Sequence, residues 1–152
     1  MIYIMSDLHG CYEKYSKMLS VLKLKENDVL YILGDITDRG PDGIKILLDL
    51  IYRKNVIALC GNHDQKAGVL LSRLMKPEGT IKREQFDKQL KFWLADGGTP
   101  TYERFLELAE PEKTAIVEYL KAMPFCKRIE VNGWTYFLSH TVPEKELMPE
   151  RP

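Results

Sequence analysis

Residue types that bind metal ions gather in four short motifs. Residues 7–10 read Asp-Leu-His-Gly, residues 34–40 read Gly-Asp-Ile-Thr-Asp-Arg-Gly, residues 61–64 read Gly-Asn-His-Asp and residues 139–141 read Ser-His-Thr. All three histidines of the 152-residue chain lie in these motifs. Turn formation accounts for glycine, aspartate and asparagine, but it does not require histidine. The coincidence therefore favours a metal site over four unrelated turns.

The spacing and chemistry of the side chains suit transition metals. Asp7 and His9 are two residues apart, so in an extended chain they share a face and can reach one cation. Asp35 has two carboxylate oxygens and could bridge two cations, while Asn62 offers an amide oxygen and His140 a second imidazole. A mixed oxygen and nitrogen set suits Mn²⁺, iron or Zn²⁺ better than Ca²⁺ or Mg²⁺, which prefer oxygen alone.

Each of these residues has a simpler explanation when it is taken alone. An Asp-x-His pair is more often a loop cap than a pair of ligands, and Asp35 and Asp38 stand near glycines, as turn residues do. A lone His140 is more often hydrogen-bonded at a strand end than bound to a metal. It is the combination of the motifs in one chain that favours a metal site.

The elements that must position these motifs are short strands alternating with helices. Apolar runs at residues 2–5, 28–33 and 56–60 predict strands, and helical periodicity predicts helices at residues 12–24 and after Pro41. This β-α-β-α-β order predicts a layered α/β domain with parallel strands, in which ligands bind beyond the carboxyl ends of the strands.

The second half of the chain is predicted to be helical and then to end in a hairpin. Residues 63–123 are mostly helical in pattern, with breaks at residues 77–79, 97–98 and 111, and the aromatic side chains of Phe86, Phe92 and Trp93 are expected in the core. Asn132-Gly133 favours a type I′ turn between strands at 127–131 and 134–139. The prediction is one domain over residues 1–152, with a layered mixed sheet flanked by helices.

The bulk composition disfavours several classes of protein and partner. The formal net charge is zero, which disfavours nucleic acid as a partner. The three cysteines are widely spaced and form no CxxC pair, unlike a secreted disulfide scaffold. The apolar start is too short for a signal peptide or a membrane span, so we expect a cytoplasmic protein with no membrane partner.

The three early motifs, in this order and at these intervals, resemble those of the calcineurin-like metallophosphoesterases. The Asp-Arg-Gly ending at residues 38–40 resembles the bacterial and phage branch that includes Ser/Thr protein phosphatases, the phage lambda phosphatase and diadenosine tetraphosphate hydrolases. Residues 93–101, a tryptophan followed by a Gly-Gly pair, resemble a segment of the same branch. The resemblance covers nearly the whole chain and implies a metallophosphoesterase β-sandwich.

The resemblance also implies two metal sites. Asp7, His9 and Asp35 would hold the first divalent cation, and Asp35, Asn62 and His140 would hold the second. Mn²⁺ is favoured, with iron or Zn²⁺ as alternatives. Such a pair can lower the pKa of a shared water, and the resulting bridging hydroxide would attack phosphorus in line.

Three further residues receive roles from the resemblance. His63 is implied as the proton donor to the leaving oxygen, and Asp38 would orient its imidazole. Arg39 offers a planar fork of donors for phosphate oxygens, and Asn62 is expected to touch phosphate as well as metal.

The chain departs from the family pattern at its C-terminal end. The family has a late Gly-His motif, and no histidine follows His140. This predicts a domain truncated at the C-terminus, a weaker second metal site, and an incomplete half of the fold available for self-association.

The leading functional prediction is a metallophosphatase that hydrolyses phosphomonoesters, such as Ser/Thr phosphoprotein side chains. One alternative is a dinucleoside polyphosphate hydrolase. Another is a catalytically impaired metal- or phosphate-binding module, because the last ligand histidine is absent.

Overall fold

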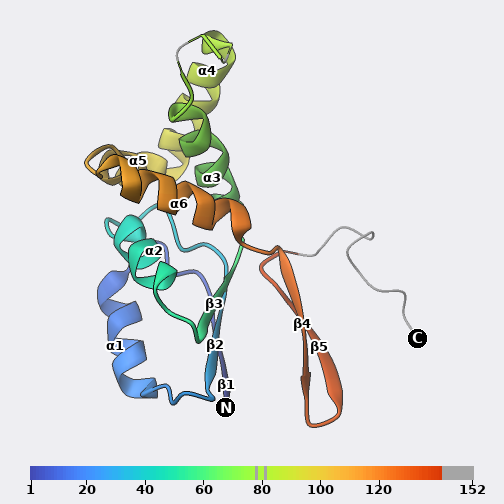
Figure 1. The fold of residues 1–152 in the computed structure, drawn as a ribbon. Helices are drawn as coiled ribbons and strands as arrows, with labels where there is room; N and C mark the ends of the chain where they lie inside the picture. The colour runs from blue at the N-terminus through green and yellow to red at the C-terminus, as the bar shows by residue number, and fades with distance from the viewer. Residues whose placement is uncertain (78, 81, 142–152) are drawn as a thin grey trace.

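The computed structural model describes residues 1–77, 79–80 and 82–141 and contains two sheets (Figure 1). The first is parallel, with its strands in the order β1 (Ile2–Met5), β2 (Val29–Leu33) and β3 (Val56–Leu59). The second is an antiparallel hairpin of β4 (Cys126–Val131) and β5 (Trp134–Ser139). In the parallel sheet, the middle strand β2 is a continuous apolar run, as expected of a strand with neighbours on both sides and both faces.

Helices connect the parallel strands and then form a group beyond their carboxyl ends. The connecting helices are α1 (Tyr12–Leu22) and α2 (Gly43–Ile51). The later helical segments are α3 (Asn62–Leu74), α4 (Arg83–Trp93), the π-helical turn η1 (Leu94–Gly98), α5 (Thr99–Leu106) and α6 (Glu110–Ala122). Figure 1 shows α1 and α2 on one side of the parallel sheet and the hairpin on the other, with α3 and α4 extending past the end of β3. None of the described helices combines the length and hydrophobicity of a membrane span.

The two faces of the parallel sheet are covered to different extents. Alternate residues such as Leu30 and Ile32 lie in the main core with the helices. The opposite face forms a smaller cluster in which Tyr31 packs with Leu138 of the hairpin. On β1 the side chains of this second face remain open, since Ile2 and Ile4 are 38% and 52% exposed. Self-association through this face stays a prediction.

The structure confirms the predicted fold class and refines its details. The hairpin pairs Val131 with Trp134, and Asn132 and Gly133 between them have φ of 51° and 80°, as a type I′ turn requires. The parallel and antiparallel strands form two separate sheets rather than one mixed sheet.

Three details of the helical region differ from the prediction. Pro111 lies in the first turn of α6 rather than at a break, because proline at that position loses no helical hydrogen bond. The Gly-Gly pair kinks the chain, with φ of 105° at Gly97, but helical structure continues on both sides. Phe86 and Trp93 are buried as expected, whereas Phe92 is 68% exposed, so its place in the core was wrongly predicted.

Candidate metal centre

Residues with left-handed backbone conformation are concentrated in the loops at the carboxyl edge of the parallel sheet. Seven non-glycine residues among those described have positive φ, and five of them lie in the first two motifs. These five are Asp7 (56°), His9 (40°), Asp35 (53°), Asp38 (68°) and Arg39 (66°). Each such conformation costs about 1 kcal/mol or more, and strain of this kind gathers at functional sites.

Three of the predicted ligands converge around the carboxylate of Asp35. Ligand atoms of Asp7, Asp35 and His140 all lie within 4.8 Å of one another. The Nε2 atoms of His9 and His140 are 3.6 Å and 3.3 Å from Asp35 Oδ2. Two donor atoms bound to one ion at about 2.1 Å lie roughly 3–3.5 Å apart, so these separations suit shared cations. The position of Asp35 between two imidazoles is the one that a bridging ligand needs.

Both of these imidazoles are oriented by backbone carbonyl groups. His9 Nδ1 lies 3.1 Å from the carbonyl oxygen of Thr37, and His140 Nδ1 lies 2.6 Å from that of Leu33. A carbonyl can only accept, so Nδ1 is the donor in each ring, and Nε2 is the ring atom left to bind a metal ion. Metal-binding histidines are commonly fixed in this way.

Asn62 lies at the edge of this group of ligands. It is the first residue of α3, and its side chain is exposed. The preceding residue, Gly61, contacts Asp35 so closely that a Cβ there would lie 2.2 Å from Asp35 Oδ1. The following residue, His63, donates its backbone N–H to the same oxygen over 3.1 Å. Asp7, His9, Asp35 and His140 thus bring carboxylate and imidazole donors together, and such a set fits divalent cations. Asn62 stands between the two residues that contact Asp35, and its amide stays a predicted ligand.

His63 forms a second cluster beside these ligands. Its Nδ1 lies 2.9 Å from Asp38 Oδ2, and its Nε2 lies 3.2 Å from Nη2 of Arg39. The ring of His63 packs edge-on against that of His9, with 5.1 Å between centroids. The structure therefore places the three residues predicted for catalysis next to one another and next to the predicted metal ligands.

Two residues that sequence reasoning did not assign to the site complete the surroundings of Asp38. The carboxylate of Asp38 is fully buried, and it accepts hydrogen bonds from Trp93 Nε1 at 2.8 Å and Thr101 Oγ1 at 2.9 Å. With His63 this makes three donors to one carboxylate, which fixes its orientation. The segment 93–101 was noted only for its Trp and Gly-Gly pattern, and the donor role of Trp93 depends on the fold.

Asp64 is the other site residue that the sequence did not reveal. It is fully buried, and its Oδ1 accepts the backbone N–H groups of Ile36 and Thr37, each at 3.0 Å. Its Oδ2 accepts the N–H of Gly61 at 3.1 Å. Burial raises the pKa of this carboxyl, and the hydrogen bonds from Thr37 and Gly61 act in the opposite direction. Asp64 thus joins the second motif to the third.

Comparisons with known proteins agree with this reading of the fold. A solved metallophosphoesterase from Sphaerobacter thermophilus has the same fold, with a TM-score of 0.52, 22% identity and coverage of 88% of this chain and 44% of that one. The fold is therefore that of a metallophosphoesterase. The sequence model of the calcineurin-like phosphoesterase family matches residues 1–150, and the chain belongs to that family. Its members generally bind two divalent metal ions.

The curated relatives carry a more specific name. The symmetrical bis(5′-nucleosyl)-tetraphosphatase of Wigglesworthia glossinidia brevipalpis is 36% identical over 77 residues, covering 49% of this chain and 28% of the relative. The one from Acidovorax sp. (strain JS42) is 26% identical over 141 residues, covering 91% of this chain and 43% of the relative. The chain thus spans less than half the length of these relatives.

Proposed function

We propose that this chain forms the metal- and phosphate-binding part of a hydrolase that cleaves a phosphoanhydride bond in dinucleoside polyphosphates. The observation that carries the proposal is the convergence of Asp7, Asp35 and His140 within 4.8 Å, beside the buried pair of His63 and Asp38. The choice of substrate draws on the similarity to the symmetrical tetraphosphatases. Phosphomonoester hydrolysis was the leading prediction from the motifs. Dinucleoside polyphosphate hydrolysis takes its place here because the names of the relatives support it better.

The metal ligands take the roles that the family resemblance implies. Asp7, His9 and Asp35 hold one cation, and Asp35, Asn62 and His140 hold the other. Bound cations at such a site supply water activation and neutralise charge on phosphate oxygens. We propose Mn²⁺, because the ligands mix imidazole nitrogen with oxygen.

The remaining residues bind phosphate and supply a proton. Arg39 presents its guanidinium at the mouth of the site, where it can pair with a phosphate oxygen once it leaves His63. His63 in its imidazolium form carries a proton on Nε2, and the Asp38 carboxylate at Nδ1 stabilises that charge. Proton donation matters less for a phosphoanhydride than for a phosphoserine, because a nucleoside diphosphate is a weaker base than an alkoxide.

A substrate panel tests the proposal. The purified chain with Mn²⁺ is assayed against diadenosine tetraphosphate, a phosphoserine peptide and p-nitrophenyl phosphate, with Asp35→Asn as the inactive control. Faster hydrolysis of the dinucleotide, with ADP as the product, supports the proposal. Preference for the phosphopeptide would restore the phosphomonoesterase prediction. Equal background rates for wild type and Asp35→Asn would leave only a metal- or phosphate-binding module.

A further inference from the structure

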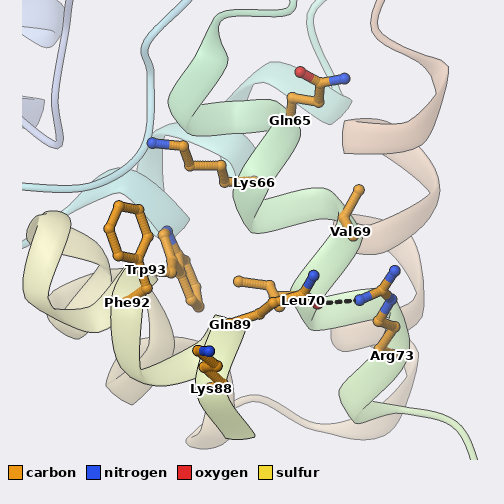
Figure 2. A pocket seen from close by; sticks show the side chains of 9 residues that line it. All are labelled: Gln65, Lys66, Val69, Leu70, Arg73, Lys88, Gln89, Phe92 and Trp93. Carbon is orange, nitrogen blue, oxygen red and sulfur yellow. Dashed lines mark hydrogen bonds between the residues drawn. The ribbon is translucent and has the colours of Figure 1, made fainter. Parts of the chain in front are cut away.

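A cavity of about 490 Å³ lies between α3 and α4, outside the metal centre (Figure 2). Val69 and Leu70 of α3 and Phe92 and Trp93 of α4 give it apolar walls. Cationic side chains stand around it: Lys66, Arg73 and Lys88. An apolar interior with a positive rim suits a ligand that combines a flat apolar group with negative charge.

Phe92 is the unusual member of the cavity wall. It is 68% exposed, whereas the adjacent Trp93 is 1% exposed and anchored in the core. The ammonium group of Lys66 lies 5.9 Å from the centroid of the Phe92 ring and 2.6 Å from Asp96 Oδ2. A large aromatic ring left open beside a cation offers a stacking surface for a base together with a contact for phosphate.

The cavity lies farther along α3 than the proposed reaction site. Asn62 begins this helix, Lys66 follows one turn later and Val69 comes after nearly another turn. At 1.5 Å of rise per residue, Val69 lies about 10 Å from Asn62 along the axis. Trp93 separates the two regions, since its ring lines the cavity while its N–H bonds to Asp38. A ligand in the cavity is therefore within reach of a phosphate held at the metal centre.

We infer that this cavity binds the nucleoside diphosphate half of the substrate, with its base stacked on Phe92 and its phosphates directed toward Lys66. The inference rests on the proposed function and adds to it the residues that select a nucleotide. Arg73 and Lys88 add positive charge beside the aromatic wall, whereas a phosphate at Lys66 would compete with Asp96 for its ammonium group. Lys88 has no hydrogen-bond or ion-pair partner within the described ranges, so its charge is available to the ligand.

Phe92→Leu tests the stacking contact because it keeps an apolar side chain and removes the ring. Loss of a stacked base is expected to raise KM for diadenosine tetraphosphate by about tenfold. The kinetics with p-nitrophenyl phosphate, which has no nucleoside, should stay within about twofold of wild type. Tyr52→Leu is the matched control, because Tyr52 is 84% exposed at the end of α2, at the opposite edge of the parallel sheet.

A binding measurement separates the inference from the proposed function. In a Trp134→Phe background, Trp93 is the single remaining tryptophan, and ADP in the cavity should quench its fluorescence. Lys88→Met should weaken this quenching and lower its dependence on salt. Hydrolysis of the dinucleotide with an unchanged KM in Phe92→Leu would overturn the inference and leave the function standing. ADP quenching that Phe92→Leu abolishes, in a chain that hydrolyses no dinucleotide, would support the cavity and overturn the function.

Discussion

Substitution of Gly61 by alanine is expected to dismantle the metal centre through one added methyl group. Gly61 has φ −88° and ψ 173°, an extended conformation that alanine adopts without strain. The effect of the substitution is therefore steric. The new Cβ would lie 2.2 Å from Asp35 Oδ1 and 2.3 Å from the backbone nitrogen of Asp35, so rotation of the carboxylate alone cannot relieve the clash.

The size of the displacement follows from these distances. Ordinary contact of a Cβ begins at 3.4 Å, and 3.4 minus 2.2 leaves 1.2 Å by which Asp35 must move away. Ligand distances in metal sites are held to within about 0.2 Å. A shift several times larger would remove the ligand that we propose both cations share. Disturbing a supporting contact at a metal site typically costs 10–100-fold in affinity, and we expect at least that loss here.

Calorimetric titration of the purified variant with Mn²⁺ measures this loss, and hydrolysis at saturating Mn²⁺ measures its effect on rate. Gly133→Ala is the matched control, because its φ is 80° while no atom lies within 4 Å of the added Cβ. It should lose about 1 kcal/mol of stability through backbone strain and keep wild-type affinity for Mn²⁺. Wild-type affinity in a folded Gly61→Ala variant would refute the assignment of Asp35 as the shared ligand.

Three further predictions concern catalysis, cation binding and pH. His63→Ala should lower turnover of a phosphoserine peptide by about 10²–10⁴-fold and turnover of the dinucleotide by less. The Mn²⁺ content of the variant should be unchanged. Loss of Mn²⁺ would show that His63 is a metal ligand. Addition of EDTA to the chain loaded with Mn²⁺ at 100 times its Kd should remove about 2.7 kcal/mol of stability. Calorimetry should then show a Tm lower by roughly 5–10 °C. An unchanged Tm would contradict a specific cation site. Burial works against ionisation of Asp49, but hydrogen bonds from Arg53 and Tyr15 outweigh it and hold the pKa of this carboxyl below its ordinary 3.8. Its stabilising effect is therefore complete above that value and is lost as pH falls through the lowered pKa. Asp49→Asn should accordingly cost about 1 kcal/mol in urea unfolding at pH 7 and less at pH 3, and equal losses would contradict the linkage.

The sequence predicted the features that depend on neighbouring residues. Strand ends, the type I′ turn at Asn132-Gly133 and the placement of ligands at the carboxyl edge follow from local patterns and from the geometry of parallel sheets. Asp35 and His140 are 105 residues apart, yet both follow strands that end in the same region. Order along the chain was therefore enough to expect them in one site.

The surroundings of Asp38 could not be predicted in this way. Trp93 and Thr101 are 55 and 63 residues from Asp38, and their contacts depend on how α4 and α5 pack over the loops. Hydrophobic periodicity predicted Phe92 in the core, but it cannot show how closely the neighbouring helix packs on that residue, which is 68% exposed. Asp64 was indistinguishable from a turn aspartate until its three backbone donors were seen.

The hydrogen bonds between the loops explain how the strained backbone persists. Five left-handed residues at about 1 kcal/mol each amount to about 5 kcal/mol, a large share of the stability of a small domain. The loops offset this cost by bonding to each other: His9 N–H donates to the Asp35 carbonyl over 2.8 Å, and Gly40 N–H donates to that of His9 over 3.0 Å. Asp64 adds its bonds at the centre of the same network. Because these contacts join backbone and buried groups, they hold the side chains of the proposed metal ligands in place.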